Sequence, residues 1–219
     1  GNDCDFDWIK IAQDPHGEHK ARTPLEEFTE ELSSLVAKIK ELGIKGDEHH
    51  SAEHYLQSYV MNRMTSFLAE KGKNIIGWDE ILEGELAEGA VVMSWRGTEG
   101  GIKAMSMGHD VIMTPGRYCY LDHMQDAPFR EPESIGGYLP LDSVYVYDPA
   151  SKTMDLPGRL LGIQGNLWSE YVVTDSHAEY MYWPRALAIA ETGWSRPERK
   201  ELADFRRRAS GAVGKLKSM

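Results

Sequence analysis

The 219-residue sequence is short of cysteine, of positive charge and of long hydrophobic runs. Its two cysteines, Cys4 and Cys119, are too few for a disulfide framework or a cysteine-rich metal centre. Lysine and arginine number 24 against 35 acidic residues, and the formal charge of -11 argues against nucleic acid or an anionic membrane as a partner. No uncharged hydrophobic run reaches the length that crossing a bilayer requires, so no membrane partner is expected.

Other common signals are also missing. The first residues are acidic rather than basic and apolar, so they do not form a signal peptide. His49, His50 and His54 lie at a helix start without a matching set of ligands, and we interpret them as solvated rather than as zinc ligands. The sequence also lacks a glycine-rich phosphate-binding loop. We therefore expect no metal and no cofactor.

What is present is a repeated pattern of a short apolar run followed by aromatic and charged residues. Strands are predicted at 74–79, 91–96, 110–114 and 160–166. The segments between them carry helix signals, and alternating strands and helices predict an α/β fold with a parallel sheet. In a β/α barrel the site lies at the carboxyl ends of the strands, which is where the aromatic and charged residues fall here.

Helices are predicted before, between and after these strands in the chain. A capping box at Thr23 begins one that runs to Gly43, and Ser51 begins a second that ends near Gly72, with Tyr55, Tyr59, Met64, Phe67 and Leu68 on its buried side. Later helices are expected from Thr98 to Met107, from a capping box at Ser176–Glu179 and after Pro197. Pro184 lacks the N–H that would reach back one turn, so it should kink or divide its helix.

Two segments fall outside this alternation. Residues 1–22 are polar and irregular, and residues 117–159 form a long insertion rich in proline, glycine, aspartate and tyrosine. Long loops inside a compact domain are usually functional. We expect one domain over residues 1–219, with 1–22 as an irregular amino-terminal segment.

Several motifs resemble one family. They are Gly77-Trp78-Asp79-Glu80-Ile81, Val92-Met93-Ser94-Trp95-Arg96-Gly97, Tyr120-Leu121-Asp122, Gly165-Asn166-Leu167-Trp168-Ser169-Glu170 and the stretch from Trp183 to Glu191. In this order they resemble glycoside hydrolase family 20, the β-N-acetylhexosaminidases, over about residues 51–195. The resemblance implies an α/β fold that is the carboxyl-terminal half, strands five to eight, of a TIM-type (β/α)8 barrel, since a closed barrel needs eight strands and about 250 residues.

A half-barrel would leave two strand edges and an inner face uncovered. Ile76, Val92, Ile112 and Ile163 are the apolar residues expected on that face. Edges and apolar patches of this kind promote association. We expect a second copy in a homodimer, the chain's own amino-terminal helices or a missing half supplied elsewhere to cover it.

The chemistry that the resemblance implies is substrate-assisted and retaining: the 2-acetamido oxygen of the sugar attacks the anomeric carbon. In the family an adjacent Asp-Glu pair orients this group and supplies general acid–base catalysis. Here Gly1-Asn2-Asp3-Cys4 stands where that motif would end, and Asp3 is the candidate orienting aspartate. No Glu follows it, so either Cys4 replaces the acid, a residue is lost at this boundary, or residues 1–4 are an unrelated terminus. The 219 residues alone should be inactive or very weakly active.

The resemblance also implies a substrate site. Trp78, Trp95 and Trp168 resemble the walls around the acetamido methyl and sugar ring, Tyr120 the tyrosine that donates to the acetamido oxygen, and Asp122 and Glu170 the acceptors for ring hydroxyls. These six side chains should converge at the carboxyl ends of the strands. For Asp79 and Glu80 we favour a supporting role in ion pairs over substrate contact, and Arg96 is expected to pair with a carboxylate.

The partner implied is a glycan that ends in β-linked N-acetylglucosamine or N-acetylgalactosamine, and the resemblance implies an exported protein. Two alternatives remain open. One is a non-catalytic half-barrel that keeps the aromatic subsite and binds sugar, and the other is a compact α/β domain without a sugar role.

Overall fold

The computed structural model describes residues 33–34, 36–46, 48, 52–153 and 155–216. These residues fall into two units that divide after Leu56. In the first unit, residues 33–34 and 36–41 are helical, and Gly43 follows with a positive φ of 66°. This agrees with the predicted helix end, because glycine adopts this conformation without strain. Asp3, Cys4 and the segment 1–22 lie outside the described residues.

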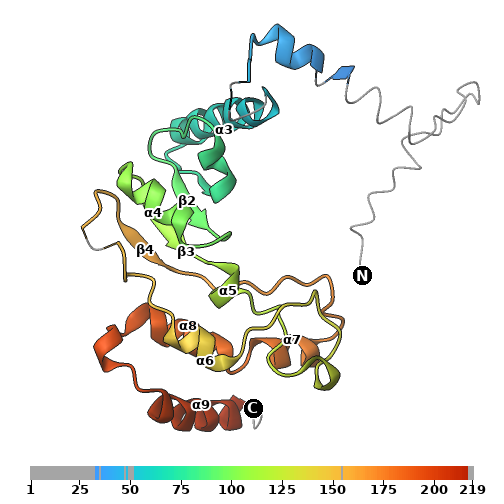
Figure 1. Ribbon diagram of the computed structural model, residues 1–219, viewed down its shortest axis with the longest axis vertical. Coiled ribbons are helices and arrows are strands. Elements are labelled where there is room, and N and C mark those ends of the chain that lie inside the picture. Colours follow the sequence, from blue (N-terminus) through green and yellow to red (C-terminus); the bar gives the residue numbers. More distant parts are fainter. Residues whose placement is uncertain (1–32, 35, 47, 49–51, 154, 217–219) are drawn as a thin grey trace, which may run out of the picture. The chain divides into compact units, whose positions relative to one another are not determined.

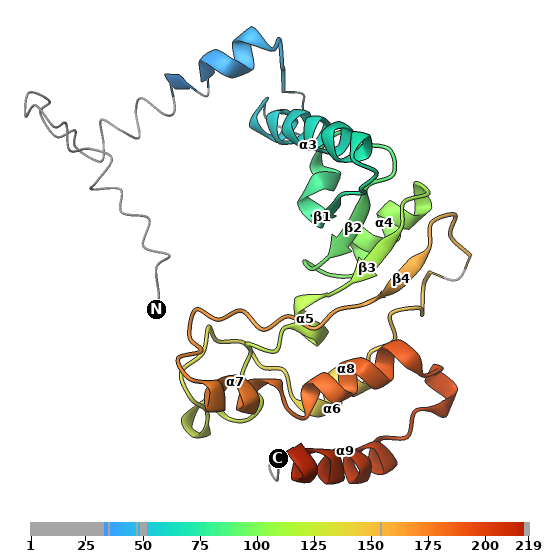
Figure 2. The same cartoon turned by 180° about the vertical axis from the view of Figure 1, so that it is seen from behind.

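The second unit is built on a parallel sheet, which confirms the predicted α/β class. Among the described residues the sheet has four strands in chain order: β1 (Ile76–Trp78), β2 (Val91–Ser94), β3 (Val111–Met113) and β4 (Leu160–Ile163). Figures 1 and 2 show them side by side. Each lies within a predicted strand but is shorter.

The register of the sheet decides which residues face the helices. Val92 pairs with Val111, and both side chains are fully buried in a cluster with Ala104 and Met105 of α4 (Glu99–Ser106). Successive strand residues point to opposite faces, so Met93 points away from this cluster. The prediction that Val92 lies on the open face was therefore wrong.

Ile163 was also wrongly placed, because it lies against Gly193 of α8 (Arg185–Trp194). Ile76 and Ile112 are the other two residues predicted on the open face. Ile76 is 52% exposed, and Ile112 is partly buried.

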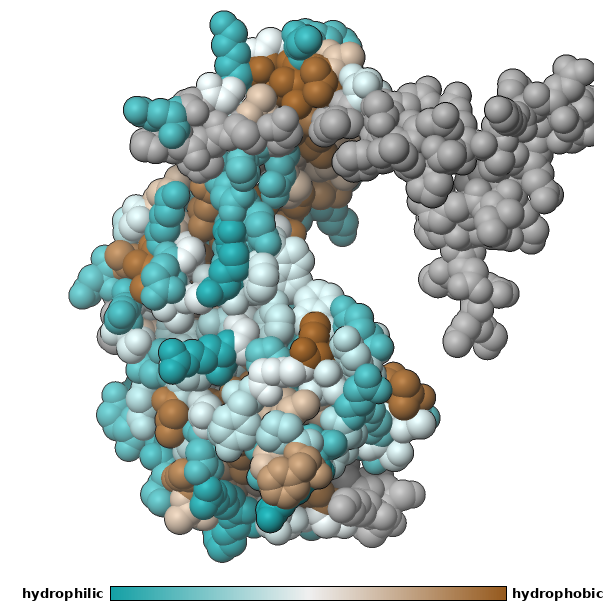
Figure 3. Space-filling model, turned by 45° about the vertical axis from the view of Figure 1, so that its right-hand side comes forward, coloured by the Kyte–Doolittle hydropathy of each residue, from teal (hydrophilic) through white to brown (hydrophobic). Residues whose placement is uncertain are grey.

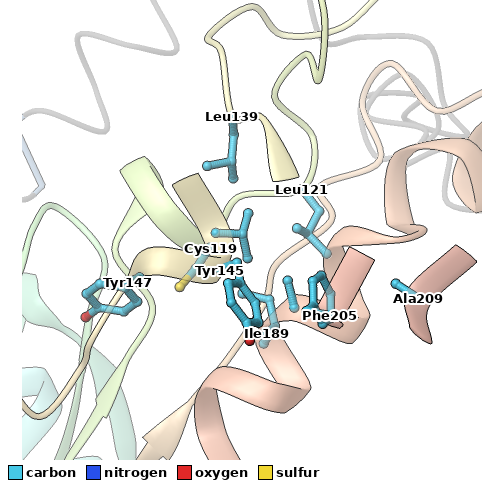
Figure 4. Packing of buried hydrophobic residues seen from close by; sticks show 10 residues of the cluster. Cys119, Leu121, Leu139, Tyr145, Tyr147, Ile189, Phe205 and Ala209 are labelled. Atoms are coloured by element: carbon cyan, nitrogen blue, oxygen red, sulfur yellow. The ribbon is translucent and has the colours of Figure 1, made fainter. Parts of the chain in front are cut away.

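A second cluster of buried residues joins the insertion to the carboxyl-terminal helices. α6 (Leu141–Val146), α8 and α9 (Leu202–Leu216) pack together beyond β4 (Figure 1). Tyr145 of α6 stacks on Phe205 of α9 with ring centroids 4.4 Å apart. Figure 4 shows these rings beside Cys119, Leu121 and Ile189, so the segment after β3 is anchored in this core.

The helix predictions held with local corrections. α3 (Ala52–Glu70) ends before Gly72 as expected, but Met64 and Phe67 are about half exposed rather than buried. The helix predicted before Pro184 is divided into α7 (Asp175–Tyr182) and α8, as the missing N–H of proline requires. The cap of α7 is Thr174, whose Oγ1 accepts from the N–H of His177 at 3.1 Å, and not Ser176.

The insertion carries short elements: α5 (Gly116–Cys119), a 3₁₀ turn (Pro128–Arg130) and α6. A 3₁₀ turn also follows β1 (Asp79–Glu83), and another precedes α9 (Pro197–Arg199). The face of this unit seen in Figure 3 is hydrophilic over much of its area, with hydrophobic side chains in separate patches. Within the part of the chain described, no helix is both long and hydrophobic enough to span a membrane.

Candidate active site

A pocket of about 540 Å³ lies at the carboxyl ends of the four strands. All six residues predicted to converge line it: Trp78, Trp95, Tyr120, Asp122, Trp168 and Glu170. Trp78 ends β1, Trp95 follows β2, and the other four lie on the segments after β3 and β4. Parallel strands bring these segments to one edge of the sheet, which explains how residues 92 positions apart in the chain, from 78 to 170, share one pocket.

Aromatic rings form the walls of the pocket. The ring centroids of Trp78 and Trp168 are 5.8 Å apart, and those of Tyr120 and Trp168 are 6.3 Å apart. The Trp95 ring is stacked on Tyr120 at 6.2 Å with an interplanar angle of 23°. Such walls offer flat apolar surfaces, which suit the apolar face of a sugar ring or a methyl group.

Carboxylates behind the rings hold the end of β2 in place. Asp79 is 1% exposed, and its Oδ2 accepts from the backbone N–H groups of Trp95 and Arg96 at 3.0 and 3.2 Å. Its Oδ1 accepts from Arg96 Nε at 2.6 Å, and Arg96 also pairs with Glu83. The expected pairing of Arg96 with a carboxylate is thus confirmed, and Asp79 is occupied with supporting contacts.

Glu80 differs from its neighbour because it lines the pocket. Both of its oxygens accept from Trp95 Nε1, at 3.0 and 2.9 Å. A charge-assisted bond of this kind fixes the plane of the indole. Glu80 thus holds the wall that Trp95 provides.

The polar end of the pocket is formed by Tyr120, Asp122 and His123. Burial raises the pKa of the Tyr120 hydroxyl, so Tyr120 keeps its proton at neutral pH and can donate. Burial also raises the pKa of Asp122, which is 5% exposed, and the negative Glu170 nearby acts in the same direction. Asp122 Oδ1 has no hydrogen-bond partner among the described residues, which is unusual for a buried carboxylate oxygen. A hydroxyl of a bound molecule would satisfy it.

The segment that carries Tyr120 and Asp122 is tied to the end of β4. Leu121 N donates to Asn166 O at 2.6 Å, and Asn166 N donates to Cys119 O at 2.8 Å. The Asn166 side chain donates to Thr114 Oγ1 at 2.7 Å. These bonds extend the pairing of β3 with β4 beyond the strands, so the polar residues stand on a fixed backbone.

Other lining residues were not identified from the sequence. They are His123, Ile135, Gly136 and Gly137, and all four belong to the insertion. Gly137 has a positive φ of 74°, and a Cβ there would come within 2.8 Å of the His123 ring. The length of the insertion signalled a role at the site, but no local pattern marked these positions. Within the described residues no group of three His, Cys, Asp or Glu side chains could hold a metal ion.

Aromatic walls with carboxylates at the carboxyl edge of a parallel sheet are typical of the carbohydrate sites of α/β proteins. Comparison with known proteins agrees with this class. The model of the glycosyl hydrolase family 20 catalytic domain matches residues 27–197. The chain belongs to glycosyl hydrolase family 20.

Relatives at the sequence level carry names of the same family. The chain is 51% identical over 167 residues to a beta-hexosaminidase of Porphyromonas gingivalis, which covers 75% of the chain and 22% of the relative. It is 32% identical over 155 residues to a beta-hexosaminidase of Vibrio furnissii, covering 68% of the chain and 25% of the relative. The chain therefore spans about a quarter of the length of these relatives.

Solved structures of family 20 enzymes also match the chain. A family 20 exo β-N-acetylglucosaminidase from Vibrio harveyi, in complex with N-acetylglucosamine, matches with a TM-score of 0.70 and 29% identity. The match covers 83% of this chain and 28% of that one. An N-acetyl-β-hexosaminidase from Streptomyces plicatus matches with a TM-score of 0.61 and 27% identity, covering 69% and 32%.

Proposed function

We propose that this chain supplies the sugar-binding half of a retaining exo-β-N-acetylhexosaminidase, which removes terminal N-acetylglucosamine or N-acetylgalactosamine from β-linked glycans by substrate-assisted catalysis. The observation that carries the proposal is the pocket itself. Trp78, Trp95 and Trp168 surround it, and Asp122 and Glu170 line it from the segments after β3 and β4. The Vibrio harveyi structure, which holds N-acetylglucosamine, supports the same substrate class.

Each pocket residue has a role that fits its surroundings. The three indoles enclose the acetamido methyl and the sugar ring, and the protonated Tyr120 hydroxyl donates to the acetamido oxygen as that oxygen attacks the anomeric carbon. Asp122 and Glu170 accept from ring hydroxyls. Transfer of the methyl to a dry aromatic pocket favours N-acetylated over plain hexoses by roughly 1–3 kcal/mol.

The general acid is assigned to the half of the barrel that strands one to four would form. β1 to β4 correspond in this proposal to strands five to eight of a (β/α)8 barrel in one domain over residues 1–219. The outer edges of β1 and β4 pair with no strand among the described residues, and Ile76 and Leu161 on these strands are about half exposed. The other half-barrel or a second copy of the chain covers them. Asp3 is proposed as the aspartate that orients the acetamido group.

The test compares the 219-residue chain with the complete gene product. Tryptophan fluorescence titrated with N-acetylglucosamine and with glucose measures binding, and release of nitrophenol from a nitrophenyl N-acetyl-β-glucosaminide measures turnover. We expect both proteins to prefer N-acetylglucosamine and the complete product alone to turn over at full rate. Full-rate turnover by the 219 residues would refute the assignment of the acid.

The alternatives give different results in the same assays. Binding without turnover by the complete product would favour a non-catalytic sugar-binding protein, and no sugar binding by either protein would refute the sugar site. Light scattering on the chain decides whether it forms a dimer. Export is proposed from the family, and fractionation of the source cells tests it.

A further inference from the structure

Arg185 is a charged residue in the core that the proposed sugar contacts do not use. It is the first residue of α8, its side chain is fully buried, and it forms no ion pair with a described residue. Burying a charge is costly unless hydrogen bonds compensate for the lost water. The contacts of its guanidinium therefore require an explanation.

All five N–H donors of the guanidinium are used on backbone carbonyls. Nε and Nη2 donate to Met181 O at 3.2 and 2.6 Å, and Nη2 also donates to Leu121 O at 2.5 Å. Nη1 donates to His123 O at 2.8 Å and to Leu139 O at 3.0 Å. A planar guanidinium has five donors in a fixed arrangement, so these four carbonyls are held at set positions relative to one another.

The division between α7 and α8 makes this arrangement available. In an uninterrupted helix the backbone N–H of residue 185 would donate to the carbonyl of residue 181. Pro184 breaks the helix, and the side chain of Arg185 donates to that carbonyl instead. The guanidinium thereby joins α7 to two segments of the pocket side of the molecule.

Two of the four carbonyls belong to the residues on either side of Asp122. Leu121 and His123 are both fixed by the guanidinium, and Leu139 ends the part of the insertion that contains the pocket residues Ile135 to Gly137. We propose that Arg185 is a positioning residue, which sets the backbone from Tyr120 to His123 and thereby aims the Asp122 carboxylate into the sugar pocket. This inference rests on the proposed function.

Lysine at this position would keep the charge but has three donors on a flexible stem. R185K should therefore loosen the Asp122 segment without removing the positive charge. A misplacement of about 1 Å can lower a reaction rate a hundredfold. The hydrogen bonds from Asp122 to the sugar depend on geometry in the same way, so we expect N-acetylglucosamine affinity to fall roughly tenfold to a hundredfold. R207K is the matched control, because Arg207 is exposed on α9 and pairs with Asp204. It should leave the affinity unchanged.

A double-mutant cycle separates positioning from general destabilisation. The dissociation constant of N-acetylglucosamine is measured by tryptophan fluorescence for the complete gene product and for its R185K, D122N and R185K/D122N variants. If Arg185 acts through Asp122, the double variant binds no more weakly than D122N alone. Equal losses for R185K in both backgrounds would overturn the proposal. No sugar binding by the unsubstituted protein would instead overturn the proposed function.

A second measurement does not depend on the folding of an Arg185 variant. In the unsubstituted protein, the ¹⁵N resonances of the buried Arg185 guanidinium should shift when N-acetylglucosamine saturates the site. The shift should be absent in D122N at saturating sugar. A guanidinium that does not respond to bound sugar in the unsubstituted protein would overturn the positioning role.

Discussion

Both carboxylate oxygens of Glu80 accept from the indole Nε1 of Trp95, at 3.0 and 2.9 Å. The acid follows β1 and the indole follows β2, so the bond joins the ends of two adjacent strands at the wall of the pocket. The wall that Trp95 forms is thus held by a charge from the neighbouring strand. Glu80 directly follows Asp79 in the chain. Asp79 accepts from the backbone N–H groups of Trp95 and Arg96, whereas Glu80 accepts from the Trp95 ring.

Removal of Glu80 should free the Trp95 ring. Hydrogen bonds to charged groups contribute about 1.5–3 kcal/mol. Without this bond the sugar must order the Trp95 ring when it binds, which costs part of that free energy, so E80A should weaken N-acetylglucosamine binding by roughly tenfold. E80Q keeps one acceptor oxygen and should bind with intermediate affinity. Fluorescence titration measures both, and E88A, at an exposed glutamate outside the pocket, is the control. Equal affinities for E80A and the unsubstituted protein would show that the ring holds its place unaided.

Trp168 should contribute to sugar binding although its side chain is partly exposed. It contacts the rings of both Trp78 and Tyr120, and a sugar ring placed on it would bury an apolar face. W168A should weaken sugar binding by about 1.5–3 kcal/mol, the usual contribution of burying a large apolar side chain. W194A is the matched control, since Trp194 is 92% exposed and lies outside the pocket. A comparable loss in W194A would contradict the assignment of the wall.

Sugar binding should depend on pH through Asp122. Burial holds the pKa of Asp122 above its usual 3.8, and only the ionised form is a full acceptor for sugar hydroxyls. Affinity should therefore rise as the pH increases through the raised pKa, with a midpoint above 3.8. Burial lowers the pKa of His123, so this neighbour is neutral at pH 7. Calorimetric titration of N-acetylglucosamine at a series of pH values measures the midpoint, and the step should disappear in D122N.

Phe205 should anchor α9 to the core. Its ring is 2% exposed and stacks on Tyr145, so its removal would leave a cavity in the core. F205A should lower the free energy of unfolding by about 3–5 kcal/mol, which urea denaturation measures. F129A is the control, because Phe129 is 83% exposed and its loss should change stability by less than about 0.5 kcal/mol. A small loss for F205A would mean that α9 contributes little to the stability of the second unit.

Most of the predictions about the site came from the order of the motifs along the chain. The strand ends at Trp78, Trp95 and Trp168 were recognisable because a tryptophan follows an apolar run within a few positions. Parallel strands bring such ends together whatever the loops do, so the convergence of the six residues followed from local pattern and one topological rule. The roles of these residues in binding sugar stay predictions.

Other features depended on contacts between distant segments. Val92 and Ile163 were assigned to the wrong face because an apolar run shows no alternation, and only the register with Val111 and the contact with Gly193 distinguish its two sides. Met64 and Phe67 were expected to be buried because they lie on an apolar stripe of their helix. Helical spacing indicates such a stripe but does not show whether another element packs on it. The cap of α7 fell on Thr174, two residues before the predicted position.

The sequence by itself determined the α/β class, the family and the list of aromatic and acidic residues at the strand ends, since these rest on local spacing and on motifs that read along the chain. The tertiary structure decided how those residues are held. Arg185 reads in the sequence as one cation in a helical motif, and its four carbonyl acceptors lie at positions 121, 123, 139 and 181. These acceptors could not be predicted from the sequence, because every residue carries the same backbone carbonyl. Only the folded structure shows which carbonyls lie within reach of the five guanidinium donors.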